Sequence, residues 1–133
     1  MDSTISRQAR VDLTKSLTVT TRPAGSTTWY YEIRGPGFIT LFTPPAGRTK
    51  LAISTLTYAN PDDFRNHSDL IVYPTPDCSG GFLDSVERVM VPPFDTVTIS
   101  FPQPLLIGPG GSNWCLAAGL DNHLVLTATG YYY

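Results

Sequence analysis

Alternation of apolar and polar residues, interrupted at short intervals by proline and glycine, most constrains the fold of this chain. In one clear example Val97, Ile99 and Phe101 share one parity, and hydroxyl side chains lie between them. A period of two places successive side chains on opposite faces of a β-strand and does not fit a helix. No stretch of about 12 residues has the period of an amphipathic helix. The chain is therefore predicted to be all-β.

Turn signals divide the chain into about eight or nine short strands. In the predicted strand 49–58 the alternation changes face. Leu51 and Ile53 are at odd-numbered positions, whereas Leu56 and Tyr58 are at even-numbered positions. A β-bulge near Ser54 would restore a common inward face. Short strands at this spacing predict an antiparallel β-sandwich that is jelly-roll-like. The predicted strands are 17–21, 27–33, 38–43, 49–58, 69–73, 82–91, 96–101, 113–118 and 123–129, and a crossover after 101 leads into 105–107.

The 133 residues fit one domain, which can bury about two-thirds of its unfolded surface. Residues 1–15 lack the period of two and are predicted to be a short N-terminal arm, so the single sandwich domain spans 16–133. Pro102 and Pro104 are expected to flank a crossover between two strands, because proline cannot donate to a strand ladder. The polar segment 59–68 is expected to be a loop.

Charge and hydropathy exclude two classes of partner. The formal net charge is −2, and the nine Lys and Arg residues form no cluster that would neutralise several phosphates, so nucleic acid is not expected as the main partner. No run of about 18 apolar residues is present, so no membrane-spanning helix is expected. The first residues lack the apolar core of a secretory signal, and secretion by that route is not expected.

Cys78 and Cys115 are the only two cysteines. Their spacing matches no zinc or redox motif, and two thiols alone do not complete a zinc site. A disulfide between them remains open. The favoured interpretation is one buried thiol at Cys115, which lies between Trp114 and Leu116, and one loop thiol at Cys78.

Catalytic motifs are absent from the sequence, and we expect no catalytic residue, no cofactor and no metal. His67 and His123 are the only histidines, and neither lies in a recognisable pattern with a nucleophile. A hydrolase that uses either histidine with a distant carboxylate is the third-ranked alternative.

The densest polar cluster of the chain lies in the 60–69 segment. Carboxylate and amide oxygens close in sequence can bind a hard cation or a sugar, and this segment is therefore a candidate glycan or ion loop. The favoured interpretation is a solvated loop with Asx turns, since the spacing of a calcium-binding loop is absent. The candidate residues are Asp62, Asp63, Asn66 and Asp69.

Aromatic and apolar residues exceed what one core needs at three places. Trp29 and Tyr31 are expected in the core, with Tyr30 half-exposed on the opposite face. The strand 38–43 is apolar on both faces, and a strand of that kind lies in a stack or at an interface. Three C-terminal tyrosines would fray unless they docked on a neighbour. The predicted oligomer or partner contacts are Tyr30, Phe38, Phe42, Tyr131, Tyr132 and Tyr133, with Arg7 and Arg10 of the arm.

The C-terminal third resembles small jelly-roll domains of tailed-bacteriophage virion proteins. In those domains a strand leads into a crossover like Phe101-Pro102-Gln103-Pro104, a tight turn follows, and the chain closes on a strand like Thr129-Gly130-Tyr131. Pro44-Pro45-Ala46-Gly47 resembles their earlier turn. The resemblance covers roughly 38–131, and the chain departs from it at Gly108-Pro109-Gly110-Gly111, where Pro-Ala-Gly would be usual.

The resemblance implies a non-enzymatic capsid decoration, head-fibre, neck or receptor-binding module, often a trimer. A homo-oligomer, with a trimer favoured, would then contact a capsid or other virion protein. The protein would be made in the host cytoplasm and would reside in the virion. The alternative is a carbohydrate-binding module that recognises a cell-surface glycan through Trp29, Tyr30 and Tyr31 and the 60–69 loop.

Overall fold

The computed structural model describes residues 22–79, 81, 84–108 and 111–133. The predicted arm with Arg7 and Arg10, and the predicted strand 17–21, lie outside these residues. The described part of the chain is all-β and contains no helix, as predicted. No segment in it therefore has the helical length and hydropathy needed to cross a membrane. The strands are β1 (Thr27–Arg34), β2 (Gly37–Phe42), β3 (Leu51–Ala59), β4 (Asn66–Tyr73), β5 (Asp84–Val91), β6 (Thr96–Ile107), β7 (Cys115–Leu120) and β8 (Val125–Tyr132).

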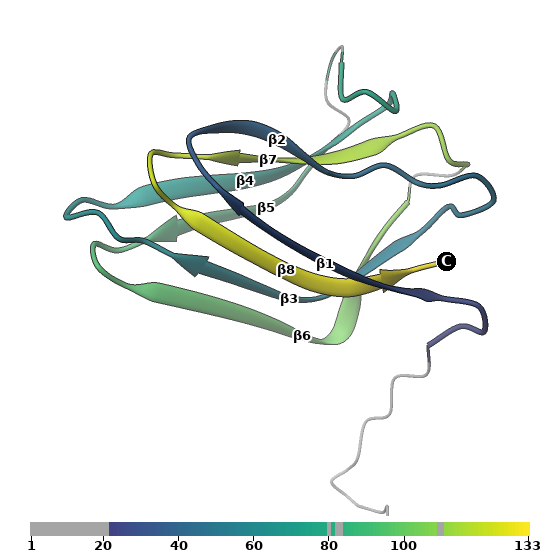
Figure 1. The fold of residues 1–133 in the computed structure, drawn as a ribbon, viewed down its shortest axis with the longest axis horizontal. Coiled ribbons are helices and arrows are strands. Elements are labelled where there is room, and N and C mark those ends of the chain that lie inside the picture. Colours follow the sequence, from purple (N-terminus) through teal and green to yellow (C-terminus); the bar gives the residue numbers. More distant parts are fainter. Residues whose placement is uncertain (1–21, 80, 82–83, 109–110) are drawn as a thin grey trace, which may run out of the picture.

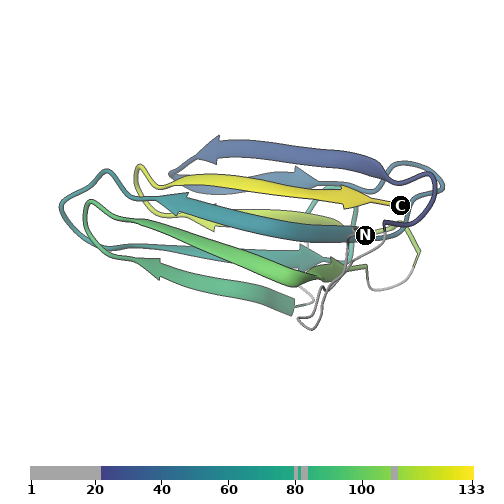
Figure 2. The ribbon, with the colours of Figure 1, turned by 90° about the horizontal axis from the view of Figure 1, so that it is seen from below.

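The strands form two four-stranded antiparallel sheets, which confirms the predicted sandwich. The orders are β1-β8-β3-β6 and β2-β7-β4-β5. In Figure 1 the second sheet is the upper layer and the first is the lower layer. Figure 2 faces the sheet β1-β8-β3-β6, with the other layer behind it. The strand pairs are nested along the chain, since β1 pairs with β8, β2 with β7, β3 with β6 and β4 with β5.

One hydrophobic core lies between the sheets. Its aromatic part gathers around Phe42, whose ring centroid lies 6.1 Å from Trp29, 5.7 Å from Trp114 and 5.1 Å from Tyr132. Trp29 is buried, Tyr31 packs partly buried against the core, and Tyr30 points outward with 61% exposure. The first aromatic run therefore lies as the favoured interpretation predicted, because successive strand residues alternate between the two faces.

The predicted β-bulge in β3 is confirmed. The register shifts between Ile53 and Thr55 against both neighbouring strands, and against β8 this leaves Ser54 as the extra residue. The bulge moves Leu56 and Tyr58 onto the same buried side as Leu51 and Ile53, and all four are fully buried. On the neighbouring strand Gly130 pairs with Ile53, directly beside the bulge. The shift in apolar phase was thus a reliable sign of an irregular strand.

The predicted crossover at Pro102 and Pro104 is wrong, because β6 runs unbroken from Thr96 to Ile107. β6 is an edge strand of its sheet, and an edge tolerates proline because one row of its backbone groups faces away from the ladder. Ile53 pairs with Leu105 and Thr55 pairs with Ser100, so residues 101–104 all lie opposite Ser54. The prolines thus mark a wide irregularity within one strand.

Two other predictions need correction. Phe42 is buried in the core at 7% exposure, and it does not share an exposed face with Phe38, which is 66% exposed. Register shifts between Thr40 and Phe42, so Leu41 is an extra residue that turns Phe42 inward. The strand predicted at 69–73 begins three residues earlier, at Asn66, because Asn66 and Ser68 are inward-facing and their polar side chains hid the alternation.

Candidate functional site

Asn60 forms a hydrogen-bonded clamp at the end of the sandwich where the loops after β3, β5 and β7 meet. The side chain is only 3% exposed. Its Nδ2 donates to the carbonyl oxygens of Phe64 at 2.8 Å and of Val91 and Pro92 at 3.1 Å. Its Oδ1 accepts from the backbone nitrogen of Asp62 at 3.0 Å. One buried amide therefore ties the 60–64 turn to the end of β5, as a satisfied buried polar group must.

A second buried amide extends this clamp to the β7–β8 turn. Asn66 Nδ2 donates to Asn60 Oδ1 and to Asp62 Oδ2, each at 2.8 Å. Asn66 Oδ1 in turn accepts from Asn122 Nδ2 at 2.8 Å. Asp62 Oδ1 lies 2.9 Å from His123 Nδ1. The polar residues of this end therefore satisfy one another and hold three loops in register.

The predicted glycan or ion loop is not assembled. Asn66 is fully buried with its amide used in the clamp, and Asp62 is bound by Asn66 and His123. Asp69 lies on β4 and its Oδ1 accepts from Arg88 Nε at 2.7 Å, while Asp63 is exposed elsewhere in the turn. The described residues contain no group of three or more acidic, histidine or cysteine side chains that could hold a metal ion. The four candidate residues of the glycan or ion loop are close in sequence, but their side chains point in different directions because a strand begins at Asn66.

Asp62 makes the stability of this end sensitive to acid. The hydrogen bond from Asn66 is the main cause that lowers the pKa of Asp62, and His123 adds to it. A carboxylate with a lowered folded-state pKa stabilises the fold above its unfolded value of about 4, and the contribution is lost as pH falls through the folded value. We expect Asp62→Asn to lose less stability than the native chain on acidification from about pH 5 to pH 2. Urea unfolding across that range measures the effect, and parallel curves for the two proteins would contradict it.

Each histidine lies beside an aspartate, yet neither is placed against a nucleophile in the described part of the chain. His123 Nδ1 is 2.9 Å from Asp62 Oδ1, and His67 Nδ1 is 3.3 Å from Asp121 Oδ2. Both imidazoles are largely exposed, at 64% and 47% of the side chain. No hydroxyl or thiol hydrogen-bonds to either ring among the described residues. The pairs lack the third member of a nucleophilic triad, and nothing in their surroundings excludes water.

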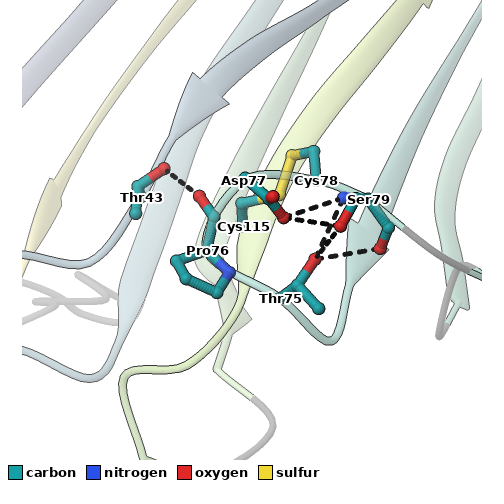
Figure 3. Close-up of a disulfide and its surroundings, with 7 residues drawn as sticks. All are labelled: Thr43, Thr75, Pro76, Asp77, Cys78, Ser79 and Cys115. Atoms are coloured by element: carbon teal, nitrogen blue, oxygen red, sulfur yellow. Dashed lines mark hydrogen bonds between the residues drawn. A yellow bond between two sulfur atoms is a disulfide. The ribbon is translucent and has the colours of Figure 1, made fainter.

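The structure pairs Cys78 with Cys115 in a disulfide, so the favoured interpretation of two separate thiols is wrong. The two Cα atoms are 5.5 Å apart and the cysteines are separated by 37 residues in the sequence. Cys115 begins β7 and is fully buried, whereas Cys78 lies in the loop between β4 and β5 with a φ of 57°. The bond therefore fastens that loop to the first residue of β7 (Figure 3).

The disulfide loop is also held by hydrogen bonds of its own. Thr75 Oγ1 accepts from the Ser79 nitrogen at 3.0 Å, and Asp77 Oδ1 accepts from Ser79 Oγ at 2.7 Å. Thr43 Oγ1 donates to the Pro76 carbonyl at 3.2 Å, which ties the loop to the end of β2. Figure 3 shows these groups around the two sulfur atoms. Ser79 and Thr75 lower the pKa of Asp77, so the loop keeps a carboxylate at this end of the sheet.

The outward face of the sheet β1-β8-β3-β6 is broad and poor in charge. At its middle the register places Tyr30, Thr129, Thr55 and Ser100 in one row across the four strands. The hydroxyls of Thr55 and Thr129 bond one another at 2.5 Å. The charged outward residues of these four strands are Glu32 and Arg34, and both lie on edge strand β1. Charge depletion of this kind distinguishes the centre of an interface from ordinary surface.

A hollow of about 410 Å³ lies within this face beside the double irregularity of β3 and β6. Tyr30 and Tyr131 are among the residues that line it. Tyr131 is 7% exposed because Arg22 lies over its ring, 4.8 Å from the centroid, and Tyr133 stacks beside it at 6.0 Å. Leu106, at 60% exposure, lies on the same face. The face thus combines an apolar projection with a hollow.

The predicted contact residues are divided between opposite faces of the sandwich. Tyr30 and Tyr131 lie on the outward face of the sheet β1-β8-β3-β6. Phe38 lies on the outward face of the other sheet, and Phe42 is in the core. Tyr132 faces inward and contacts Phe42. They therefore form no single patch.

Sequence reasoning included Asn60 only as the first residue of the polar 60–69 segment, and it missed Asp121 and Asn122. Compared with protein-family models and with curated proteins, the chain gives no match, so its function is inferred from the residues described above.

Proposed function

We propose that the protein is a non-enzymatic structural protein of a phage virion, a decoration or accessory head or neck component that acts through oligomeric protein–protein contacts. The nested pairing of the eight described strands supports this proposal, because nested strand pairs also occur in jelly rolls, an architecture common in viral capsid proteins. The disulfide is consistent with a virion, since disulfides persist on particles outside the reducing cytoplasm.

The observation that carries the proposal is the charge-poor outward face of the sheet β1-β8-β3-β6. A contiguous face with exposed apolar and aromatic groups is a protein interaction site more often than ordinary surface. Tyr30 and Leu106 are 61% and 60% exposed on it, and the central threonines bond one another instead of requiring water. A hollow beside such groups can accept an anchoring side chain from a partner.

A second copy of the chain is the proposed occupant of this face, and a trimer is the proposed assembly. Burial of the face against neighbouring copies would remove apolar surface from water, which is the main driving force of association. Several copies acting together would then raise the avidity for the capsid beyond that of one chain. In the proposal Tyr30 and Tyr131 keep the contact role that the sequence predicted, while Phe42 has none.

Leu106→Lys is expected to weaken self-association by at least about tenfold, because it places a charge in the proposed interface. Met90→Lys is the matched control, since Met90 is 49% exposed on the outward face of the other sheet. Sedimentation velocity over a concentration series measures both variants beside the native chain. Equal dissociation of the two variants, or none in Leu106→Lys, would contradict the assignment of this face.

Carbohydrate binding through the residues first considered is not supported by their positions. Trp29 is in the core, Asp62 and Asn66 are bound within the buried amide clamp, and Asp69 is paired with Arg88. A virion role is tested separately by antibody labelling of purified particles in the electron microscope. Label on intact particles is expected, and its absence from particles that contain all other virion proteins would contradict the proposal.

A further inference from the structure

The outward face of the sheet β2-β7-β4-β5 contains a shallow trough along β7. The outward residues of β7 at the centre of the sheet are small, namely Ala117 and Gly119. β2 and β4 flank β7 on either side and carry larger side chains. Two hollows, of about 200 and 180 Å³, lie along this line and share Phe38 as a lining residue.

Phe38 lies across the trough. It pairs directly with Gly119, and a Cβ at that glycine would lie 3.2 Å from two atoms of the Phe38 ring. The ring is therefore held against the strand by a position without a side chain, yet it remains 66% exposed. An aromatic ring covering a glycine across a strand pair is a known stabilising arrangement. Here it also leaves an exposed ring between two hollows.

Polar groups close both ends of the trough. At one end Asp121 Oδ2 accepts from the backbone nitrogen of His67 at 2.9 Å. Asp69, which binds Arg88, lies opposite Gly119 and therefore level with Phe38. Asp121 Oδ1 accepts no hydrogen bond from any described residue. At the other end the disulfide loop supplies Asp77 and Cys78 as lining residues. Carboxylates fixed at each end of a central ring offer acceptors at both ends and an apolar platform between them.

From this arrangement we propose that the trough binds a neutral, linear oligosaccharide, whose sugar rings straddle Phe38. A sugar presents C–H groups that pack on an aromatic face and hydroxyls that donate to carboxylates. Each hollow is smaller than the roughly 300–1,000 Å³ of a pocket for a compact ligand, which favours an extended one. The carboxylates of Asp77 and Asp121 disfavour an anionic chain through like-charge repulsion.

A peptide fits the same trough less well. Strand addition needs an open sheet edge, and β7 is paired on both sides, with β2 and with β4. A second copy of the chain is also a poor occupant, because the Asp69–Arg88 ion pair and the His67–Asp121 pair interrupt the apolar surface around Phe38. The trough lies on the opposite sheet from the face proposed for assembly, so a failure of one proposal does not affect the other.

The test is a titration of the full, oxidised chain with neutral hexasaccharides of glucose, mannose and N-acetylglucosamine, followed by ¹H–¹⁵N NMR. We expect at least one to shift the amide signals of β2 and β7 with a dissociation constant of about 1 mM or below. Phe38→Ala should weaken that binding by about tenfold or more, and Phe38→Trp should retain it. Phe94→Ala is the matched control, since Phe94 is 73% exposed outside the trough.

The proposal is overturned if none of the three sugars binds at about 10 mM, or if binding survives Phe38→Ala. Stronger shifts with a hyaluronan hexasaccharide or with an oligolysine peptide would also overturn it, in favour of an anionic or basic ligand. The mass of Phe38→Ala by light scattering separates the two proposals. If that variant dissociates, Phe38 is an assembly contact and the sugar site is wrong, whereas loss of sugar binding at native mass supports it.

Discussion

Gly130→Ala is expected to lower the free energy of unfolding by about 4 kcal/mol or more. A Cβ at position 130 would lie 2.0 Å from the carbonyl oxygen of Ala52 and 3.1 Å from the Cα of Ile53. Both obstacles are backbone atoms of a central strand, and they cannot rotate away as a flexible side chain can. The bulge at Ser54 brings the backbone of β3 close to β8, so position 130 has no room for a side chain and must be glycine.

Urea denaturation of Gly130→Ala beside Gly81→Ala measures this effect. Gly81 is the matched control because a Cβ there would meet nothing within 4 Å. The control should remain within about 0.5 kcal/mol of the native chain. A Gly130→Ala protein that unfolds at the native urea concentration would show that β3 and β8 do not approach each other as described.

Reduction of the disulfide is expected to lower the free energy of unfolding by about 4 kcal/mol, since the bond closes a loop between cysteines 37 residues apart. The effect arises mainly in the unfolded chain, whose freedom the cross-link limits. Reduction also frees the loop that forms one end of the β7 trough, so the loop should lose protection from proteolysis.

Urea unfolding with and without reductant tests this prediction, and a double variant, Cys78→Ser with Cys115→Ala, is the control. The double variant should match the reduced native chain and should not respond to reductant. A native chain whose unfolding midpoint is unchanged by reductant, or whose mass corresponds to two free thiols, would contradict the pairing of Cys78 with Cys115.

The strands and the β3 bulge could be predicted from the sequence because they depend on local alternation. The irregularity of β3 is visible in the sequence because the apolar residues change from odd to even positions within the strand. These residues are Leu51, Ile53, Leu56 and Tyr58. Phe42 was predicted on the wrong face for the complementary reason. The extra residue Leu41 is apolar, like its neighbours, and a bulge among uniformly apolar residues leaves no shift in the pattern.

Contacts between distant segments could not be predicted from one sequence. Asn60 and Asn66 appeared to belong to a solvated loop. Their partners Val91 and Asn122 come from the end of β5 and from the β7–β8 turn, which only the strand order brings together. The same holds for Cys78 and Cys115, whose pairing depends on β4 and β7 being neighbours. The prolines of β6 were interpreted as a break because its place at the sheet edge was unknown.

The most direct test of the proposed function is the mass of the native chain in solution, measured by size-exclusion chromatography with light scattering at micromolar concentration. A stable oligomer is expected, with a mass three times that of the 14.5 kDa chain. A single species of 14.5 kDa at every concentration would contradict it, because the charge-poor face of the sheet β1-β8-β3-β6 would then remain open to water.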